Sequence, residues 1–337
     1  MRQLLHRVFP LCLLSLMTAS TLRSAELRST NESASLSLIS TGRVVFVGDS
    51  ITYSGQYLEF LETALRLKFP TRSPELLNLG LPSETVSGLS EPGHAGGQFP
   101  RPDLHERLGR LLEKTHPDLV VACYGMNDGI YYPLGDARFA AFKSGVERLR
   151  GAVAARGARM IHITPPVFDP MPLKGRTLPA GLQEYRSPYE GYNQVLDRYS
   201  EWLVSQRSNG WEVIDIHLPM NRLIAEQRKS LPAYLLAGDG VHLNSAGHWL
   251  ITQTILEYLG LADLAVQDVA TLLKRSSKGT ELLEVVQQRQ RTLKDAMLTA
   301  VGHLRPGMAK GESLEAAERA ASELSGKAKA LVAPVGE

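Results

Sequence analysis

The chain has 337 residues, of which 43% are hydrophobic and 21% charged, and its formal net charge is +2. This is the composition of a soluble globular protein with enough chain to bury a sizeable core. The nearly balanced charge argues against a nucleic-acid or anionic-membrane partner.

The chain begins with the layout of a secretory signal peptide. Basic residues open it, the run 8–19 is almost entirely apolar, and small residues suited to cleavage follow. The run is too short for an ordinary membrane span. An uncleaved amino-terminal anchor is the alternative, because Arg23 makes a cleavage site after Ala25 irregular. We therefore expect a signal peptide over 1–25, a polar linker over 26–41, and a secreted or periplasmic protein with no integral membrane span after cleavage.

The sequence contains two cysteines, Cys12 and Cys123. Because Cys12 lies in the predicted signal peptide, the mature chain would keep one thiol and could form no disulfide within itself. Cys123 lies in an apolar run and is predicted to be a small buried hydrophobic residue.

Residues 42–260 alternate short apolar runs with amphipathic segments. Strands are predicted over 44–48, 76–79, 119–124, 160–164 and 211–216. Helices are predicted over 56–68, 104–114, 136–156, 189–206 and 245–259, the last with Ser245 as its N-cap. Long loops are predicted over 83–102 and 167–187. This alternation predicts a doubly wound, parallel, five-stranded sheet with helices on both faces.

After Gly260 the sequence is rich in alanine, glutamate and lysine, and it contains no predicted strand. Helices are predicted there over 266–274, 281–301 and 314–324. Apolar residues recur at heptad-like spacing in this region: Leu283, Val286, Leu293, Met297 and Ala300. The stripe must be buried, either against the α/β region or against a second chain. We expect a helical C-terminal extension over 261–337, through which the chain could self-associate.

Small polar and glycine residues stand where predicted strands end. Ser50 follows the first strand in Gly48-Asp49-Ser50, Gly80 follows the second, and Asn127 follows the third in Gly125-Met126-Asn127-Asp128. Asp239 and His242 come after the fifth strand. Because the carboxyl ends of parallel strands meet at one edge of a sheet, these residues are predicted to be neighbours. The first turn lacks both the G-x-G-x-x-G pattern and the P-loop pattern of nucleotide-binding proteins. Ile51 also stands where an aspartyl phosphatase would have a second carboxylate.

These residues are the set that nucleophilic acyl transfer requires. A serine hydroxyl is a weak nucleophile and needs a base, and His242 can serve Ser50 because imidazole changes its charge near neutral pH. Asp239 can hold one ring nitrogen of His242 and leave the other for Ser50. The backbone N–H groups of Ser50 and Gly80, with the side chain of Asn127, can donate to the oxyanion.

With four such blocks in this order and spacing, residues 42–260 resemble the SGNH hydrolase superfamily, also called GDSL esterases and lipases. The resemblance implies a flavodoxin-like sheet and ester hydrolysis without a metal or another cofactor. It implies a triad of Ser50, His242 and Asp239, and an oxyanion hole of Ser50, Gly80 and Asn127. Ser50-Ile51-Thr52 replaces the Ser-Leu of many lipases, a common variation. The resemblance does not extend beyond Gly260.

The sequence therefore predicts a serine esterase. With a predicted export signal and no large apolar lid, we expect small-acyl esters of glycans, acetyl esters above all, as substrates. A lysophospholipase or a thioesterase is an alternative, and so is a non-catalytic carbohydrate-binding or scaffold protein. Loss of a triad residue would favour the non-catalytic alternative, and none is lost.

Other residues that could take part in binding or catalysis are mostly expected to be structural. His94 and Arg101, within the loop 83–102, are predicted to belong to a solvated loop rather than to contact substrate. Tyrosines near Asn127 either line an acyl- or sugar-binding cleft or only pack: Tyr124, Tyr131 and Tyr132. Packing roles are expected for His162, His217 and His248. No histidine, cysteine or carboxylate cluster has the spacing of metal ligands.

Overall fold

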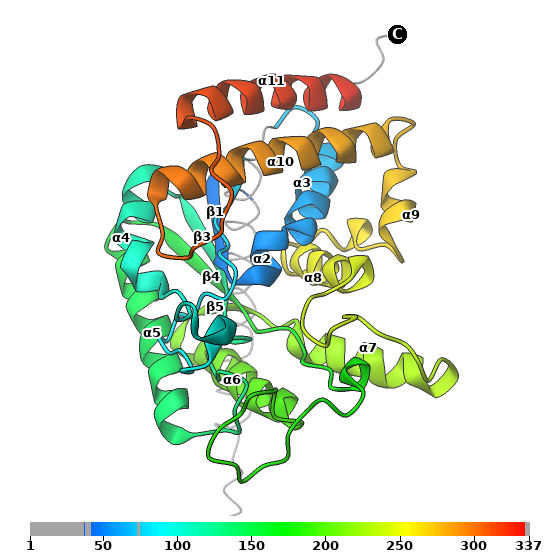
Figure 1. The fold of residues 1–337 in the computed structure, drawn as a ribbon. Helices are drawn as coiled ribbons and strands as arrows, with labels where there is room; N and C mark the ends of the chain where they lie inside the picture. The colour runs from blue at the N-terminus through cyan, green and yellow to red at the C-terminus, as the bar shows by residue number, and fades with distance from the viewer. Residues whose placement is uncertain (1–36, 38–41, 73–74, 334–337) are drawn as a thin grey trace, which may run out of the picture.

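The computed structural model describes residues 37, 42–72 and 75–333, and it is built around a five-stranded parallel sheet (Figure 1). The strands are β1 (Arg43–Gly48), β2 (Glu75–Asn78), β3 (Leu119–Cys123), β4 (Arg159–Ile163) and β5 (Glu212–Ile214). Their order is β2-β1-β3-β4-β5, which is the flavodoxin-like order. The predicted signal peptide lies outside the described residues, and so does the predicted linker apart from Ser37.

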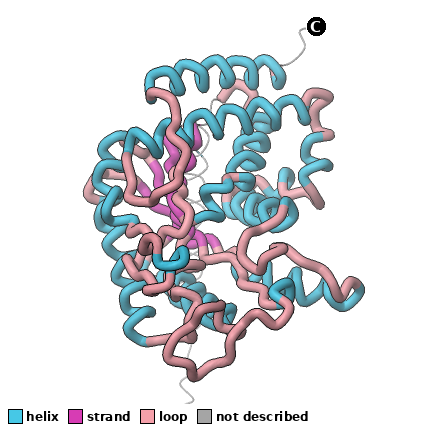
Figure 2. Tube along the Cα trace, viewed as in Figure 1, coloured by secondary structure: helices cyan, strands magenta, loops and turns pink. Residues whose placement is uncertain are grey.

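The sheet region contains seven α-helices that carry most of the fold. They are α2 (Ser50–Ser54), α3 (Gln56–Lys68), α4 (Leu104–Thr115), α5 (Asp136–Ala154), α6 (Tyr192–Ser205), α7 (His217–Ser230) and α8 (Ser245–Tyr258). Short 3₁₀ helices are η1 (His94–Gly97), η2 (Met171–Leu173), η3 (Gln206–Asn209) and η4 (Ala262–Leu264). Figure 1 shows α4, α5 and α6 on one face of the sheet and α3 and α8 on the other, and Figure 2 shows the strands enclosed between them. No helix of the described residues is long and apolar enough to cross a membrane.

β1 lies between β2 and β3 in the sheet and is buried on both faces. The side chains of its residues 44–47 are fully buried, as expected for a strand covered by helices above and below. The strand ends at Gly48, where a β-carbon would lie 2.2 Å from Thr52 Oγ1 and 2.7 Å from the Cys123 carbonyl oxygen. Glycine at this position therefore lets α2 turn back tightly against the ends of β1 and β3.

The structure differs from the sequence prediction at several elements, among them α2, α7 and the start of α8. Helix α7 falls in a segment for which no element was predicted. Only His217, Met220 and Ile224 of its fourteen residues are buried, so its apolar stripe is weak. The N-cap of α8 is Asn244 rather than Ser245, because the Asn244 side chain accepts the Gly247 N–H at 3.1 Å.

The C-terminal extension consists of α9 (Val269–Leu273), α10 (Gly279–Val301) and α11 (Leu314–Val332). In Figure 1, α10 lies across one end of the sheet region beside α3, and α11 lies outside α10. Leu293 and Met297 of α10 belong to the same apolar core as the sheet. Val286 belongs to a second apolar cluster that α10 forms with α11. The predicted stripe is thus covered within this chain.

A buried polar network fixes α10 to the sheet region. Glu62 of α3 is fully buried, and its two oxygens accept from Arg66 at 2.7 Å and Arg289 at 2.9 Å. Gln290 Nε2 also donates to Glu62 Oε2 at 2.6 Å and to the Leu76 carbonyl of β2 at 3.0 Å. Breaking a buried ion pair by removing one partner costs about 3–5 kcal/mol. The position of α10 on α3 and β2 is therefore strongly determined.

Candidate active site

Ser50 is the first residue of α2, at the carboxyl end of β1. Asp49 caps this helix, and its carboxylate accepts the Ile51 N–H at 2.9 Å. The loop after β2 approaches so closely that a β-carbon on Gly80 would lie 2.3 Å from the Tyr53 nitrogen. Only glycine allows this approach, so the turn that carries Ser50 is fixed between β1 and the loop after β2.

The three residues predicted as a triad form one chain of hydrogen bonds. His242 Nε2 lies 2.9 Å from Ser50 Oγ, and His242 Nδ1 lies 2.6 Å from Asp239 Oδ2. The other carboxylate oxygen of Asp239 accepts the backbone N–H groups of His242 at 2.8 Å and Val241 at 3.0 Å. Both oxygens of Asp239 are thus engaged in the turn that presents His242. Ser50 and His242 meet although they are 192 residues apart in sequence.

The charge of Asp239 is stabilised although the side chain is accessible. Partial burial opposes ionisation, but the hydrogen bonds from the His242 side chain, from its backbone and from Val241 outweigh it, so the pKa of Asp239 lies below its ordinary value. The side chains of Asp239 and His242 are each 55% exposed. The arrangement is consequently open to solvent and accessible to a bulky molecule.

The amide of Asn127 is held in one orientation by its neighbours. Its Oδ1 accepts from Arg101 Nη1 at 3.0 Å and from the Tyr131 hydroxyl at 3.2 Å, and its Nδ2 donates to the Glu84 carbonyl at 3.3 Å. Two donors on one atom identify that atom as the oxygen. An amide nitrogen has two N–H groups, so one remains to donate to a ligand.

The prediction that Arg101 belongs to a solvated loop is wrong, because its side chain is buried. Its side chain is only 6% exposed, and its guanidinium donates to both carboxylate oxygens of Glu91 at 2.7 Å. His94, on the same loop, lies 3.3 Å from Glu91 and is partly buried. Neutralisation by Glu91 is what allows the arginine to be buried. The available sequence signal was an acid ten residues before an arginine in a glycine- and proline-rich loop.

The Gly80 N–H, predicted to donate to an oxyanion, already has an acceptor. It donates to Asn78 Oδ1 at 3.0 Å, while Asn78 Nδ2 donates to the Thr52 carbonyl at 2.7 Å. The Ser50 N–H is the first of its helix, a position that has no intrahelical partner. Ser50 and Asn127 therefore offer donors directly, whereas the Gly80 N–H would have to be shared with Asn78.

Two buried acids lie beneath these groups. Burial raises the pKa of Asp49 to about 7, and nearby Asp128 adds to the rise while His242 and Arg101 oppose it. Burial likewise raises the pKa of Asp128 to about 6, although its carboxylate accepts the N–H of Val86 at 2.9 Å. The floor of the site is therefore a low-dielectric region in which added charge is costly.

The other histidines and tyrosines singled out in the sequence are buried or pack against neighbouring side chains. His162 is buried in β4, and burial lowers its pKa to about 3. His217 Nε2 lies 2.7 Å from Asp197, and His248 Nε2 lies 3.1 Å from the Ser54 hydroxyl at the end of α2. Cys123 is buried as the last residue of β3, the buried Tyr124 donates its hydroxyl to Glu84 Oε2 at 2.6 Å, and Tyr132 packs against Tyr185.

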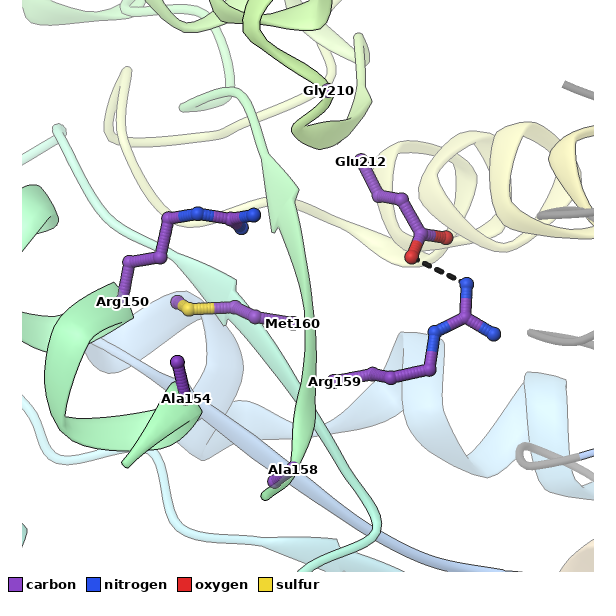
Figure 3. Close-up of a pocket in the computed structure, with 7 residues that line it drawn as sticks. All are labelled: Arg150, Ala154, Ala158, Arg159, Met160, Gly210 and Glu212. Atoms are coloured by element: carbon purple, nitrogen blue, oxygen red, sulfur yellow. Dashed lines mark hydrogen bonds and ion pairs between the residues drawn. The ribbon is translucent and has the colours of Figure 1, made fainter. Parts of the chain in front are cut away.

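A cavity of about 270 Å³ lies at the amino-terminal ends of β4 and β5. Figure 3 shows its lining residues, among which Arg159 pairs with Glu212, at 2.5 Å. The residues predicted for the catalytic site lie at the carboxyl ends of the strands. This cavity is therefore at the opposite edge of the sheet. None of them lines it. Over the described part of the chain, no group of histidine, cysteine and carboxylate side chains could hold a metal ion.

Comparison with known proteins adds a family to this geometry. The model of the GDSL-like Lipase/Acylhydrolase family matches residues 46–250, and no curated protein matches the chain. Among solved structures, the chain is similar to a gut microbial diltiazem-metabolizing enzyme, with 21% identity and a TM-score of 0.50. That match covers 66% of this chain and 47% of the enzyme, so this chain spans less than half of its length. At this identity the likeness concerns the fold.

Two further structures are similar over the same share of the chain. LAE5, an alpha/beta hydrolase enzyme from the metagenome of Lake Arreo in Spain, has 22% identity and a TM-score of 0.48, with 66% of this chain and 97% of LAE5 covered. Axe2, an acetylxylan esterase from Geobacillus stearothermophilus, has 18% identity and a TM-score of 0.47, with 66% and 96% covered.

Proposed function

Because the chain belongs to the GDSL-like lipase/acylhydrolase family, we propose that it is a serine esterase with Ser50 as nucleophile. One observation carries this proposal. It is the unbroken series of hydrogen bonds from Ser50 Oγ through His242 to Asp239, at 2.9 and 2.6 Å. A nucleophile, a base and a group that orients the base are the parts that activate a serine hydroxyl.

In the proposed mechanism, Ser50 Oγ attacks the ester carbonyl carbon while His242 Nε2 takes the hydroxyl proton. The oxyanion of the tetrahedral intermediate accepts the Ser50 N–H and the free N–H of Asn127, and the Gly80 N–H if it is shared. His242 then gives its proton to the departing alcohol, which leaves an acyl group on Ser50. A water molecule then attacks the acyl carbon while His242 takes its proton. His242 returns this proton to Ser50 Oγ as the bond between Ser50 and the acyl carbon breaks, which releases the carboxylic acid and restores the serine. Asp239 stays ionised throughout and stabilises the imidazolium.

We propose small-acyl esters of glycans, acetyl esters above all, as the substrates. The exposure of His242 and Asp239 supports a bulky alcohol group, because a sugar chain can reach the pair without entering a closed pocket. Long-chain lysophospholipids and thioesters are the competing substrates, and chain-length dependence separates them from acetylated glycans.

The test compares the wild-type protein with Ser50→Ala on nitrophenyl esters of increasing chain length and on acetylated xylan. Ser208→Ala, at an exposed position in η3, is the matched control. We expect activity greatest on acetyl esters, abolished in Ser50→Ala and unchanged in the control, with equal melting temperatures. Full turnover by Ser50→Ala would refute the nucleophile, and no turnover of any ester by the wild type would favour a carbohydrate-binding role.

We also propose that this activity is secreted or periplasmic. The support is the basic start and apolar run that precede the family-matched region. Amino-terminal sequencing of the exported protein should find a start near residue 26. A start at Met1 in the membrane fraction would indicate an uncleaved anchor instead.

A further inference from the structure

Helix α2, which carries Ser50, has only five residues. A helix this short is not stable by itself, because one turn fixes several residues for very few hydrogen bonds. The position of Ser50 Oγ therefore depends on the groups outside α2 that hold it.

Three side chains from other elements hold the end of α2. Asn78, the last residue of β2, donates to the Thr52 carbonyl at 2.7 Å and to the Tyr53 carbonyl at 3.4 Å, and His248 of α8 lies 3.1 Å from the Ser54 hydroxyl. The third is Lys294 of α10, whose Nζ donates to the Tyr53 carbonyl at 2.9 Å. Asn78 and His248 lie within the family-matched residues 46–250, whereas Lys294 lies beyond them.

Lys294 makes two contacts with the same residue of α2. Besides the bond to the carbonyl, its Nζ lies 4.0 Å from the centre of the Tyr53 ring, which is within the range of a cation–π interaction. Among the described residues its ammonium forms no ion pair. Burial lowers the pKa of Lys294, Asp295 and Glu59 oppose that shift, and Arg291 adds to it. The half-buried ammonium of Lys294, which has no carboxylate partner among the described residues, thus interacts with the carboxyl end of α2.

The element that carries Lys294 is held rigidly. The buried network around Glu62 fixes α10 to α3 and β2, and Gln287 Nε2 adds a bond to Glu59 Oε2 at 3.0 Å. The segment that follows α10 also reaches the loop 83–102, since His303 and Arg101 line one cavity of about 380 Å³. The extension therefore contacts the site region from two directions.

We propose that Lys294 is a positioning residue for the Ser50 nucleophile, so that the C-terminal extension is part of the working active site. This inference rests on the proposed esterase function. A charge-assisted bond and a ring contact fix the carboxyl end of α2, and with it the angle at which Ser50 Oγ meets His242. Misplacement of reacting groups by about 1 Å can lower a rate by about 10².

The experiment measures kcat and KM on a nitrophenyl acetate for Lys294→Met, Lys294→Arg and the control Lys329→Met, all in the full chain. Methionine keeps the apolar stem and removes the donor. Lys329 is exposed on α11, so Lys329→Met removes the same charge from the extension at a position away from α2. Rates are divided by the concentration of sites titrated with a phosphonate that reacts with serine, so that unfolded protein does not count.

We expect Lys294→Met to lose about tenfold or more in kcat with KM within twofold, because only the reacting geometry is disturbed. Lys294→Arg should recover most of the loss, since a guanidinium can also donate to the carbonyl and stack on Tyr53. If Lys294→Met does not fold, Lys294→Leu, which also lacks a donor, replaces it with the same expectation.

A kcat in Lys294→Met or its replacement equal to that of Lys329→Met would overturn the proposal, and so would a change confined to KM. Failure of this inference differs from failure of the esterase assignment. In the first case Ser50→Ala is inactive while Lys294→Met works at the full rate, and in the second Ser50→Ala itself remains active.

Discussion

The buried carboxyl of Asp49 allows a quantitative test of the electrostatics beneath the site. Burial raises its pKa from an ordinary 3.8 to about 7. Asp49→Asn removes the ionisable group, yet the amide oxygen can still accept the Ile51 N–H, so the cap of α2 is kept. The substitution therefore isolates the cost of ionising this position in the folded protein.

The sign follows from comparing the folded and unfolded chains. Below about pH 4 the carboxyl of Asp49 is protonated in both states, and it adds no pH dependence. Between about pH 4 and 7 the unfolded chain loses the proton while the folded protein retains it, so the free energy of unfolding falls as the pH rises. The gap between 3.8 and about 7 corresponds to a loss on the order of 4 kcal/mol by pH 7.

The assay is urea unfolding of the wild type and Asp49→Asn at pH values from about 4 to 8, the range that brackets both pKa values of Asp49. Glu113→Gln, at an exposed position in α4, is the control. Asp49→Asn should gain stability over the wild type as the pH rises, by up to about 4 kcal/mol. Asp128 remains in both proteins and largely cancels. A difference that stays constant with pH, or that grows in favour of the wild type, would refute the argument.

Three predictions concern the groups around Ser50. His242→Ala should be more damaging than Asp239→Ala, because the turn already restricts the ring. Both variants are assayed on one small ester, and a rate for Asp239→Ala as low as that for His242→Ala would contradict this order. Asn127→Ala should lower kcat by about 10²–10³ on a small ester, and an effect on KM alone would place Asn127 in ground-state binding. Arg101→Lys cannot pair with both oxygens of Glu91 and should lower kcat about tenfold, measured on the same ester; a wild-type rate would show that the amide of Asn127 does not depend on it.

The sheet and the place of the candidate site could be predicted from the sequence, because both depend on local patterns. Valine-rich runs that end in glycine located β1, and topology alone then predicted that Ser50, Asn127 and His242 would meet. Helix α7 was not predicted, because few of its side chains are buried and its pattern of apolar residues is therefore weak. The burial of Arg101 was not predicted. An arginine is buried only when a partner neutralises its charge, and Glu91 can be recognised as that partner only in the folded loop.

The engagement of the Gly80 N–H shows a second kind of limit. Sequence predicts where a backbone donor lies, but not which acceptor competes for it, and here the competitor is the side chain of Asn78 two residues earlier. The contact of Lys294 with Tyr53 is similarly invisible in sequence, because it joins residues 241 positions apart on elements with separate patterns.

The bond from Gln290 to the Leu76 carbonyl has a consequence for how the chain is made. β2 is an outer strand of the sheet, and the unpaired N–H and C=O groups of such a strand can template pairing with another molecule. β5, at the other border, has only three residues and offers little to pair with. Since 214 residues separate Leu76 from Gln290, β2 is synthesised long before α10 can cover it. A ribosome that stalls or a protease that cuts before α10 would release a sheet with β2 open, and such fragments should aggregate through this strand.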